Sequence, residues 1–124
     1  MSEYKRFSVS ERSKSFCYAL EGMFSFFKRE HNAVLHLLAT VAVIVLSIIF
    51  PVTRFEVIIL VIVTGLVWVT ELINTAIEKT TDLISKEDHP EIKFIKDIAA
   101  AAVLVMAAVA LLTGSLIFIP KIIV

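Results

Sequence analysis

The chain has 124 residues, of which 58% are hydrophobic and 19% charged, and its mean hydropathy is +0.88. An apolar content this far above the roughly 45–50% of soluble domains excludes an ordinary water-soluble protein. Twelve basic residues balance twelve acidic ones, which gives no support to a nucleic-acid partner, and the single Cys17 excludes an intrachain disulfide and a cysteine-based zinc site.

Charged side chains are largely confined to residues 1–30 and 78–97 and nearly vanish elsewhere. This segregation predicts an all-α integral membrane protein, because the segments inside a bilayer must be apolar. We expect one domain over residues 1–124. Its elements would be an amphipathic surface helix at about 11–29 and three transmembrane helices at about 33–50, 55–78 and 98–119.

The first expected helix follows a loose tail over residues 1–10. Apolar residues recur along it at helical spacing, while the charged residues lie off that stripe. Such a helix suits a membrane surface, although a helix packed on other helices would show the same pattern. The stripe consists of Phe16, Leu20, Met23, Phe24 and Phe27.

The three expected spans are bounded by polar residues and prolines. The first would cover about 27 Å, close to a bilayer core of about 30 Å, and end at Pro51. The second would continue as a helix past Glu78 into water. A break at Asp88-His-Pro90 would precede the third span, which is rich in alanine and would stop at Pro120. Small residues allow close approach of helices in lipid, so we expect the third span at the centre of a bundle or subunit interface.

The distribution of lysine and arginine predicts the orientation. Ten of the twelve lie in the N-terminal segment or the second polar loop, whereas Arg54 and Lys121 alone lie on the opposite side. We therefore expect the N-terminus and the second loop in the cytoplasm, and the C-terminus outside.

Four polar residues occur where the second span meets the cytoplasmic side. Glu71, Asn74, Glu78 and Asp82 fall on one stripe of a helix. Ionisable side chains are costly in a membrane and usually functional there. This stripe is suited to holding a divalent cation or to taking a proton from a lipid hydroxyl, and Glu71 would lie about 10 Å deeper than Glu78.

Glu30, Lys96 and Asp97 are expected at a comparable depth. Glu30 and Glu78 are suited to Mg²⁺, which takes carboxylates and substrate phosphates, and Lys96 is suited to phosphate oxygens. Simpler interpretations remain open. Glu78 and Asp82 would also suit the solvated end of a helix, Glu71 and Asn74 a polar clamp between helices, and Lys96 an interfacial anchor.

Two further side chains lie within the spans. His36 is expected to form a hydrogen bond between helices rather than to bind a metal, and Trp68 is expected to pack.

Several segments together resemble a known family, the small prokaryotic integral-membrane diacylglycerol kinases and undecaprenol kinases. The resemblance covers about residues 12–112, and its last segment looks more like the undecaprenol kinase branch. The matching segments are Ser15-Phe-x-Tyr18-Ala-x-x-Gly22, Glu30-x-Asn32, Glu71-x-x-Asn74-Thr-Ala-Ile-Glu78 and His89-Pro-x-x-Lys93-x-x-Lys96-Asp97-x-Ala-Ala-Ala-Ala-Val-Leu104.

The resemblance implies a homotrimer in the bacterial inner membrane that transfers the γ-phosphate of ATP, with Mg²⁺, to undecaprenol or diacylglycerol. It implies that Glu71 is the general base, that Asn74 orients the reacting groups, and that Glu30 and Glu78 bind the metal. The nucleotide would contact Tyr18, Glu30, Glu78, Asp82, Glu87, Asp88, His89, Lys96 and Asp97.

A family arginine near the start of the surface helix falls on Glu11 in an ungapped register, and Arg12 beside it is assigned that role. A subunit that relays ions or protons through Glu71 is the alternative function, and a purely structural bundle is a third.

Overall fold

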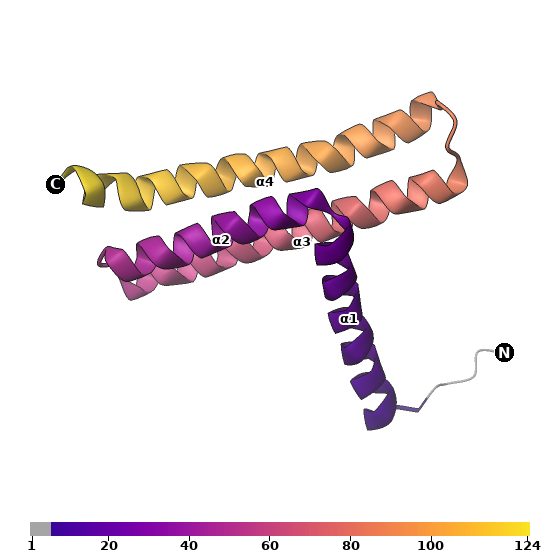
Figure 1. Cartoon of the computed structure of the whole chain (residues 1–124), viewed down its shortest axis with the longest axis horizontal. Coiled ribbons are helices and arrows are strands. Elements are labelled where there is room, and N and C mark those ends of the chain that lie inside the picture. The colour runs from indigo at the N-terminus through magenta and orange to yellow at the C-terminus, as the bar shows by residue number, and fades with distance from the viewer. Residues whose placement is uncertain (1–5) are drawn as a thin grey trace. The chain divides into compact units, whose positions relative to one another are not determined.

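The computed structural model describes residues 6–124, and these residues form helices and no strand (Figure 1). The expected all-α fold is therefore confirmed. The helices are α1 (Val9–Arg29), α2 (His31–Ile49), α3 (Arg54–Ile84) and α4 (Pro90–Ile123). The chain divides into two compact units, one up to Leu35 and the other from His36 to Val124.

The first unit contains α1, whose two ends are capped. The Ser8 side chain accepts a hydrogen bond from the Glu11 amide at 3.4 Å, and the Glu30 amide donates to the Phe26 carbonyl at 3.0 Å. The serine cap lets the helix begin at Val9, so the expected tail over residues 1–10 was wrong for its last two residues. The first five residues of that tail lie outside the described part of the chain.

The apolar stripe expected on the surface helix is exposed in the first unit. The exposed fractions are 66% for Phe16, 56% for Leu20 and 63% for Phe24. Phe26, by contrast, is buried. The stripe is thus available to another surface, and its contact with a membrane stays a prediction.

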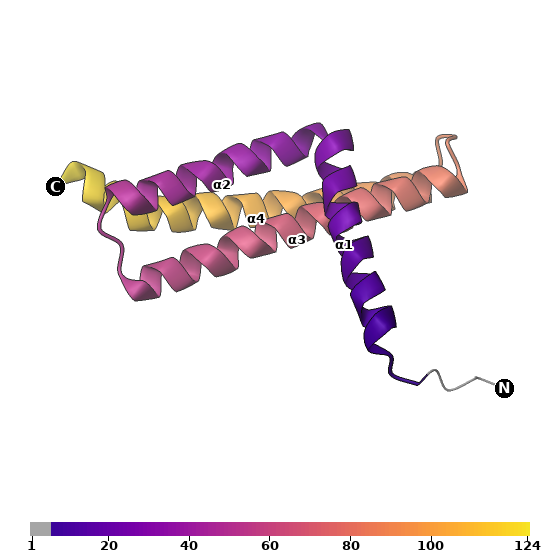
Figure 2. The same cartoon turned by 60° about the horizontal axis from the view of Figure 1, so that its bottom comes forward.

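The second unit contains α3, α4 and most of α2, which run lengthwise beside one another (Figures 1 and 2). Helices α3 and α4 are antiparallel and packed along their length. A small core of Leu60, Ile117 and Phe118 lies where α3 begins and α4 ends. At this end Lys121 pairs with Glu56 at 3.1 Å.

The bounds of α3 and α4 differ from the expected spans. Helix α3 has 31 residues, or about 46 Å, so it exceeds a bilayer core of about 30 Å. The break near Pro90 is confirmed, but α4 begins there, eight residues before the expected span. His89 is its N-cap and Pro90 occupies the first turn, where a missing N–H costs little.

Pro120 does not stop the last helix, which continues to Ile123, so that prediction was wrong. A proline removes one backbone hydrogen bond to the preceding turn. In the last turn of a 34-residue helix, this loss affects few residues beyond it.

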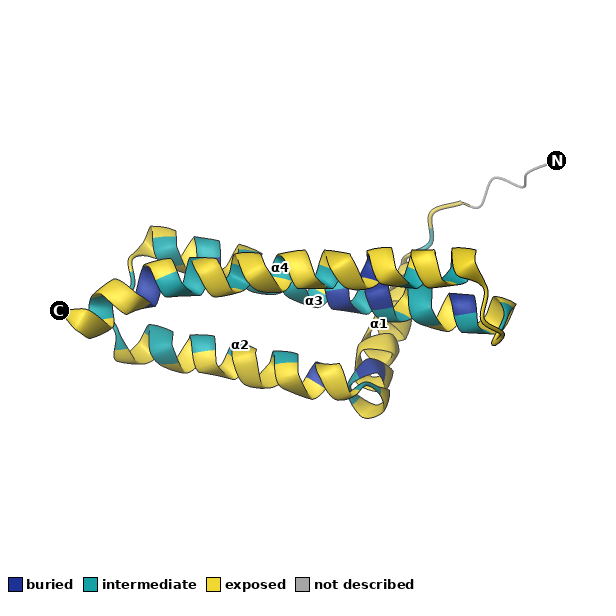
Figure 3. Ribbon diagram, turned by 90° about the horizontal axis from the view of Figure 1, so that it is seen from above, coloured by how far each residue is buried: buried dark blue, intermediate teal, exposed yellow. Residues whose placement is uncertain are grey.

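Most apolar side chains of the three long helices are exposed (Figure 3). Ile48 is 79% exposed, Leu104 71% and Leu111 74%. Helices α2, α3 and α4 are each long and apolar enough to cross a membrane. Lipid or other protein must therefore cover these surfaces, as in a membrane protein.

Candidate active site

The polar stripe expected on α3 is present, and the two of its residues that come first in the sequence are buried. Glu71 is 2% exposed and Asn74 is 7% exposed, while Glu78 and Asp82 are half-buried. Thr81, one turn beyond Glu78, is also buried. Burial of an acid and an amide on a helix this apolar requires polar partners.

Glu71 contacts α2 through a histidine. The imidazole Nε2 of His36 lies 3.3 Å from the Glu71 Oε2, and the His36 side chain is 18% exposed. The expected contact of His36 between helices is therefore present with Glu71, but no hydrogen bond joins the two side chains. A partner on another helix is what the polar-clamp interpretation predicts for Glu71, and that interpretation stays open beside the catalytic one.

Trp68 makes a second contact between the same two helices. Its indole Nε1 donates a hydrogen bond to the Thr40 hydroxyl at 2.9 Å, so Trp68 does more than pack. Its ring lies 5.9 Å from the ring of His36. No local spacing in the sequence indicated this bond, because it joins residues 28 apart.

Asn74 and Glu78 form the middle of the stripe. The Asn74 Nδ2 donates to the Glu78 Oε1 at 3.5 Å. Within residues 6–124 the buried Asn74 Oδ1 has no hydrogen-bond partner. A buried oxygen in this state calls for a ligand, ion or water, and hard cations such as Mg²⁺ take oxygens of this type.

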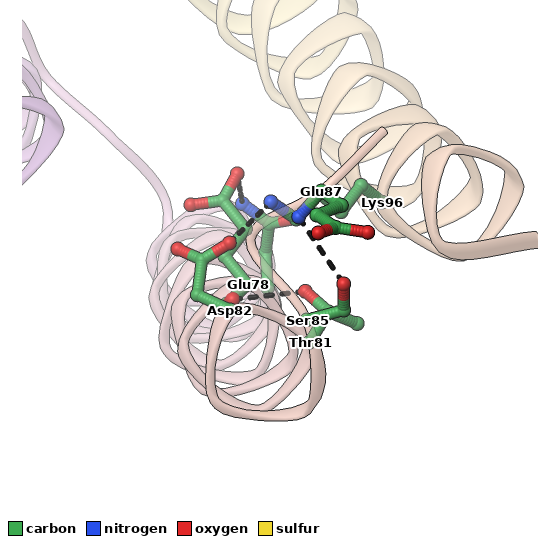
Figure 4. Close-up of polar contacts among 7 residues, drawn as sticks. Glu78, Thr81, Asp82, Ser85, Glu87 and Lys96 are labelled. Atoms are coloured by element: carbon green, nitrogen blue, oxygen red, sulfur yellow. Dashed lines mark hydrogen bonds and ion pairs between the residues drawn. The ribbon is translucent and has the colours of Figure 1, made fainter. Parts of the chain in front are cut away.

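The C-terminal end of α3 is joined to α4 by an ion pair between Asp82 and Lys96 (Figure 4). The side chains remain 47% and 36% exposed, so the lysine is accessible to a solute. Beside this pair, the Thr81 hydroxyl donates to the Glu78 carbonyl at 2.9 Å, and the Ser85 hydroxyl accepts from the Glu87 amide at 3.1 Å (Figure 4). These bonds hold the end of α3 and the start of the following loop.

A cleft of about 650 Å³ opens at this end of the second unit. Its size is within the range of small-ligand sites. The lining mixes acids and bases, as a magnesium–phosphate ligand would require. It consists of Asp82, Ser85, Lys86, Glu87, Asp88, His89, Pro90, Ile92, Lys93, Lys96 and Asp97.

Two predicted site residues in this cleft also have local structural partners. The His89 Nδ1 accepts a hydrogen bond from the Glu91 amide at 3.1 Å and so caps α4. Asp97 is paired with Lys93 one turn earlier, and both are largely exposed. Lys93 was not among the predicted site residues, although its four-residue spacing from Asp97 was a usable signal.

The structure therefore brings six of the predicted residues to one cleft and aligns three more along α3. The six are Asp82, Glu87, Asp88, His89, Lys96 and Asp97, and the three are Glu71, Asn74 and Glu78.

Three other predicted residues belong to the first unit. Arg12 lies over the Phe7 ring at 5.4 Å, Tyr18 is 65% exposed, and Glu30 is the C-cap of α1. Within residues 6–124 no three His, Cys, Asp or Glu side chains gather closely enough to hold a metal ion by themselves.

Comparison with known proteins gives the family. A model described as prokaryotic diacylglycerol kinase matches residues 17–118. The chain belongs to the prokaryotic diacylglycerol kinase family. Membership in this family makes the protein an enzyme, a lipid kinase, and the ion-relay alternative is not favoured.

Similar members of the family carry two names. The undecaprenol kinase of Bacillus subtilis is 39% identical over 108 residues, which are 87% of this chain and 88% of that protein. The diacylglycerol kinase of Synechocystis is 35% identical over 86% of this chain and 61% of the length of that protein. That of Pseudomonas aeruginosa is 34% identical over 77% and 78%, respectively.

Proposed function

We propose that the protein transfers the γ-phosphoryl group of ATP, with Mg²⁺, to the hydroxyl of undecaprenol at the cytoplasmic face of the membrane. Diacylglycerol is the second candidate acceptor. The observation that carries this proposal is the arrangement of residues on one stripe of α3. Glu71 on this stripe is buried, and Asp82, further along it, lines a cleft that is open to solvent. The undecaprenol kinase relative, matched over 88% of its length, supports the choice of acceptor.

Glu71 is the proposed general base. It takes the proton of the lipid hydroxyl while the hydroxyl oxygen bonds to the γ-phosphorus and the bond from that phosphorus to ADP breaks. Its burial in an apolar helix supports this role, because the lipid tails stay in the bilayer while the hydroxyl approaches the glutamate. Asn74 would orient the reacting groups one turn away.

The nucleotide phosphates are proposed to lie between Glu78 and Lys96. Glu78 would hold Mg²⁺, which supplies neutralisation of the phosphate charge when bound. Glu30 of the first unit is assigned to the metal by the family resemblance alone. The buried, unpartnered Asn74 oxygen beside Glu78 supports a cation or ligand at this position. The Lys96 ammonium would leave Asp82 to contact phosphate oxygens.

The remaining cleft residues are proposed to bind the rest of the nucleotide. Glu87, Asp88 and His89 would lie near the adenosine, and Asp97 would lie near the phosphates. The shared cleft supports this grouping. Tyr18 and Arg12 of the first unit are assigned to the nucleotide by the family resemblance alone.

We further propose a homotrimer in the bacterial inner membrane with the N-terminus in the cytoplasm and α1 on the membrane surface. The exposed apolar side chains along α2, α3 and α4 support an assembly within lipid. The cluster of lysines around the cleft supports its cytoplasmic location.

The proposal is tested with purified protein, radiolabelled ATP and either undecaprenol or diacylglycerol, with the products separated on a thin-layer plate. We expect labelled undecaprenyl phosphate from the wild type and about 10²- to 10⁴-fold less from Glu71→Gln, which is the typical contribution of proton transfer. Glu21→Gln, at an exposed acid on α1, is the matched control. Full activity in Glu71→Gln would end the general-base assignment, and ATP-independent ion flux in liposomes would favour the relay.

A further inference from the structure

The His36 imidazole lies against the carboxylate that the proposed reaction uses as its base. Its Nε2 is 3.3 Å from the Glu71 Oε2, and the two residues belong to different helices, α2 and α3. The glutamate is 2% exposed and the histidine 18%. An ionisable pair in this position, inside membrane-spanning helices, is expected to serve a function.

The imidazole also lies beside the Trp68 ring, and Trp68 is itself bonded to α2. Thr40, one turn further along α2, donates its hydroxyl hydrogen to the His36 carbonyl at 2.7 Å and accepts the indole N–H of Trp68 at 2.9 Å. The Trp68 ring lies 5.9 Å from the imidazole with an interplanar angle of 59°. Trp68 precedes Glu71 by three residues, so the two contacts between α2 and α3 are one helical turn apart.

These two contacts join α2 to α3 beside Glu71. A glutamate side chain alone has several rotamers and a broad terminal torsion. Contact of one carboxylate oxygen with the His36 imidazole restricts that rotation. A general base must hold its acceptor oxygen within hydrogen-bond reach of the proton it removes, and bases in enzymes are commonly oriented by a third group.

We infer that His36 is a positioning residue for Glu71, and this inference rests on the proposed kinase reaction. The imidazole Nε2 holds the carboxylate in the orientation that receives the lipid hydroxyl proton. His36 makes and breaks no bond in the transfer. The hydroxyl proton goes to Glu71, the hydroxyl oxygen bonds to the γ-phosphorus, and ADP leaves with the electrons of the broken bond.

A role limited to helix packing would give a different result from a positioning role. Loss of packing lowers the stability of the fold, whereas a misoriented base lowers the rate of the chemical step in protein that remains folded. A displacement of about 1 Å at a reacting centre can cost about 10²-fold in rate. The separation of kcat from KM therefore tests the inference.

The first measurement compares wild type, His36→Ala and His36→Gln with His31→Gln, at an exposed histidine of α2, as the matched control. We expect kcat to fall about 10- to 100-fold in His36→Ala, with the KM values for ATP and undecaprenol within about twofold. Gln keeps an N–H donor near the carboxylate and should recover part of kcat. A kcat in folded His36→Ala within twofold of wild type, or equal losses in Ala and Gln, would overturn the inference.

The second measurement does not depend on activity or on the alanine variant. We expect the side-chain nitrogen resonances of ¹⁵N-labelled His36 in detergent micelles to move in Glu71→Gln, while those of His31 stay in place. An unchanged His36 resonance would refute the contact on which the inference depends. Failure of the wild type to phosphorylate either lipid, with the His36 resonance still responding, would instead defeat the proposed function.

Discussion

Lys96 and Lys121 provide a test that separates nucleotide binding from stability. Each joins α4 to α3 by an ion pair, Lys96 to Asp82 beside the cleft and Lys121 to Glu56 at the opposite end. The Lys96 pair is 36% and 47% exposed, whereas the Lys121 pair is 20% and 24% exposed. An exposed ion pair contributes little stability, so substitution of Lys96 should be nearly silent in a melting experiment.

Nucleotide binding, in contrast to stability, should be weakened more by substitution of Lys96 than by substitution of Lys121. A hydrogen bond from an ammonium to a phosphate oxygen contributes about 1.5–3 kcal/mol, which corresponds to roughly a ten- to hundredfold change in affinity. We therefore expect Lys96→Gln to raise the KM for MgATP by this factor. Lys121→Gln removes the same charge far from the cleft and should leave the KM for MgATP within about twofold of wild type.

The assay measures initial rates of lipid phosphorylation over a range of MgATP concentrations, together with thermal unfolding in the same detergent. We expect Lys96→Gln to change KM with little change in Tm, and Lys121→Gln to lower Tm with little change in KM. An unchanged KM in Lys96→Gln would refute the assignment of this lysine to phosphate. Equal losses of Tm in the two variants would refute the argument from exposure.

Two further predictions concern the packing of the second unit, and one concerns the metal. Thr40→Val leaves the Trp68 indole N–H without its acceptor, so we expect the free energy of unfolding to fall by about 1 kcal/mol. In a double-mutant cycle, adding Trp68→Phe to Thr40→Val should lower the free energy of unfolding little further. Phe118→Ala empties part of the buried cluster and should lower the free energy of unfolding by about 3 kcal/mol, the low end for a buried phenylalanine because lipid replaces water around the helices. Leu111→Ala, at a residue that is 74% exposed, should lower it little, and equal losses in the two variants would contradict the described core. Chelation of divalent cations should abolish phosphorylation and leave the helical content by circular dichroism unchanged, and activity that persists in excess chelator would refute the magnesium requirement.

The helices could be predicted from the sequence because their causes are local. Apolar runs, the breaks near Pro51 and Pro90, and the spacing of Glu71 and Asn74 are each readable along one segment. The helix ends were less predictable. Ser8 begins α1 earlier than the polarity of that segment suggested, and α4 passes through Pro120 because a single lost bond in a last turn is tolerated.

The partners of the candidate site residues could not be predicted, because they depend on how helices meet. Spacing aligned Glu71 with Asn74 but did not indicate that His36 lies 3.3 Å from the carboxylate. Nor did it indicate that Lys96 pairs with Asp82 rather than with an acid of its own helix. Residues four apart, such as Lys93 and Asp97, were the exception, since one helical turn determines their contact.

The length of α3 links the chemistry of the lipid to that of the nucleotide. Glu71 and Asp82 are eleven residues apart on one uninterrupted helix, which corresponds to about 16 Å. The helix therefore places one carboxylate among apolar residues and another beside a cleft open to solvent. A lipid alcohol stays in the bilayer and a triphosphate stays outside it, and a helix that carries both groups can bring the two substrates together at the boundary. A glycine pair inserted between Glu78 and Asp82 should turn Asp82 by about 200° away from the stripe and loosen the helix, so kcat should fall although every side chain named in the reaction remains present.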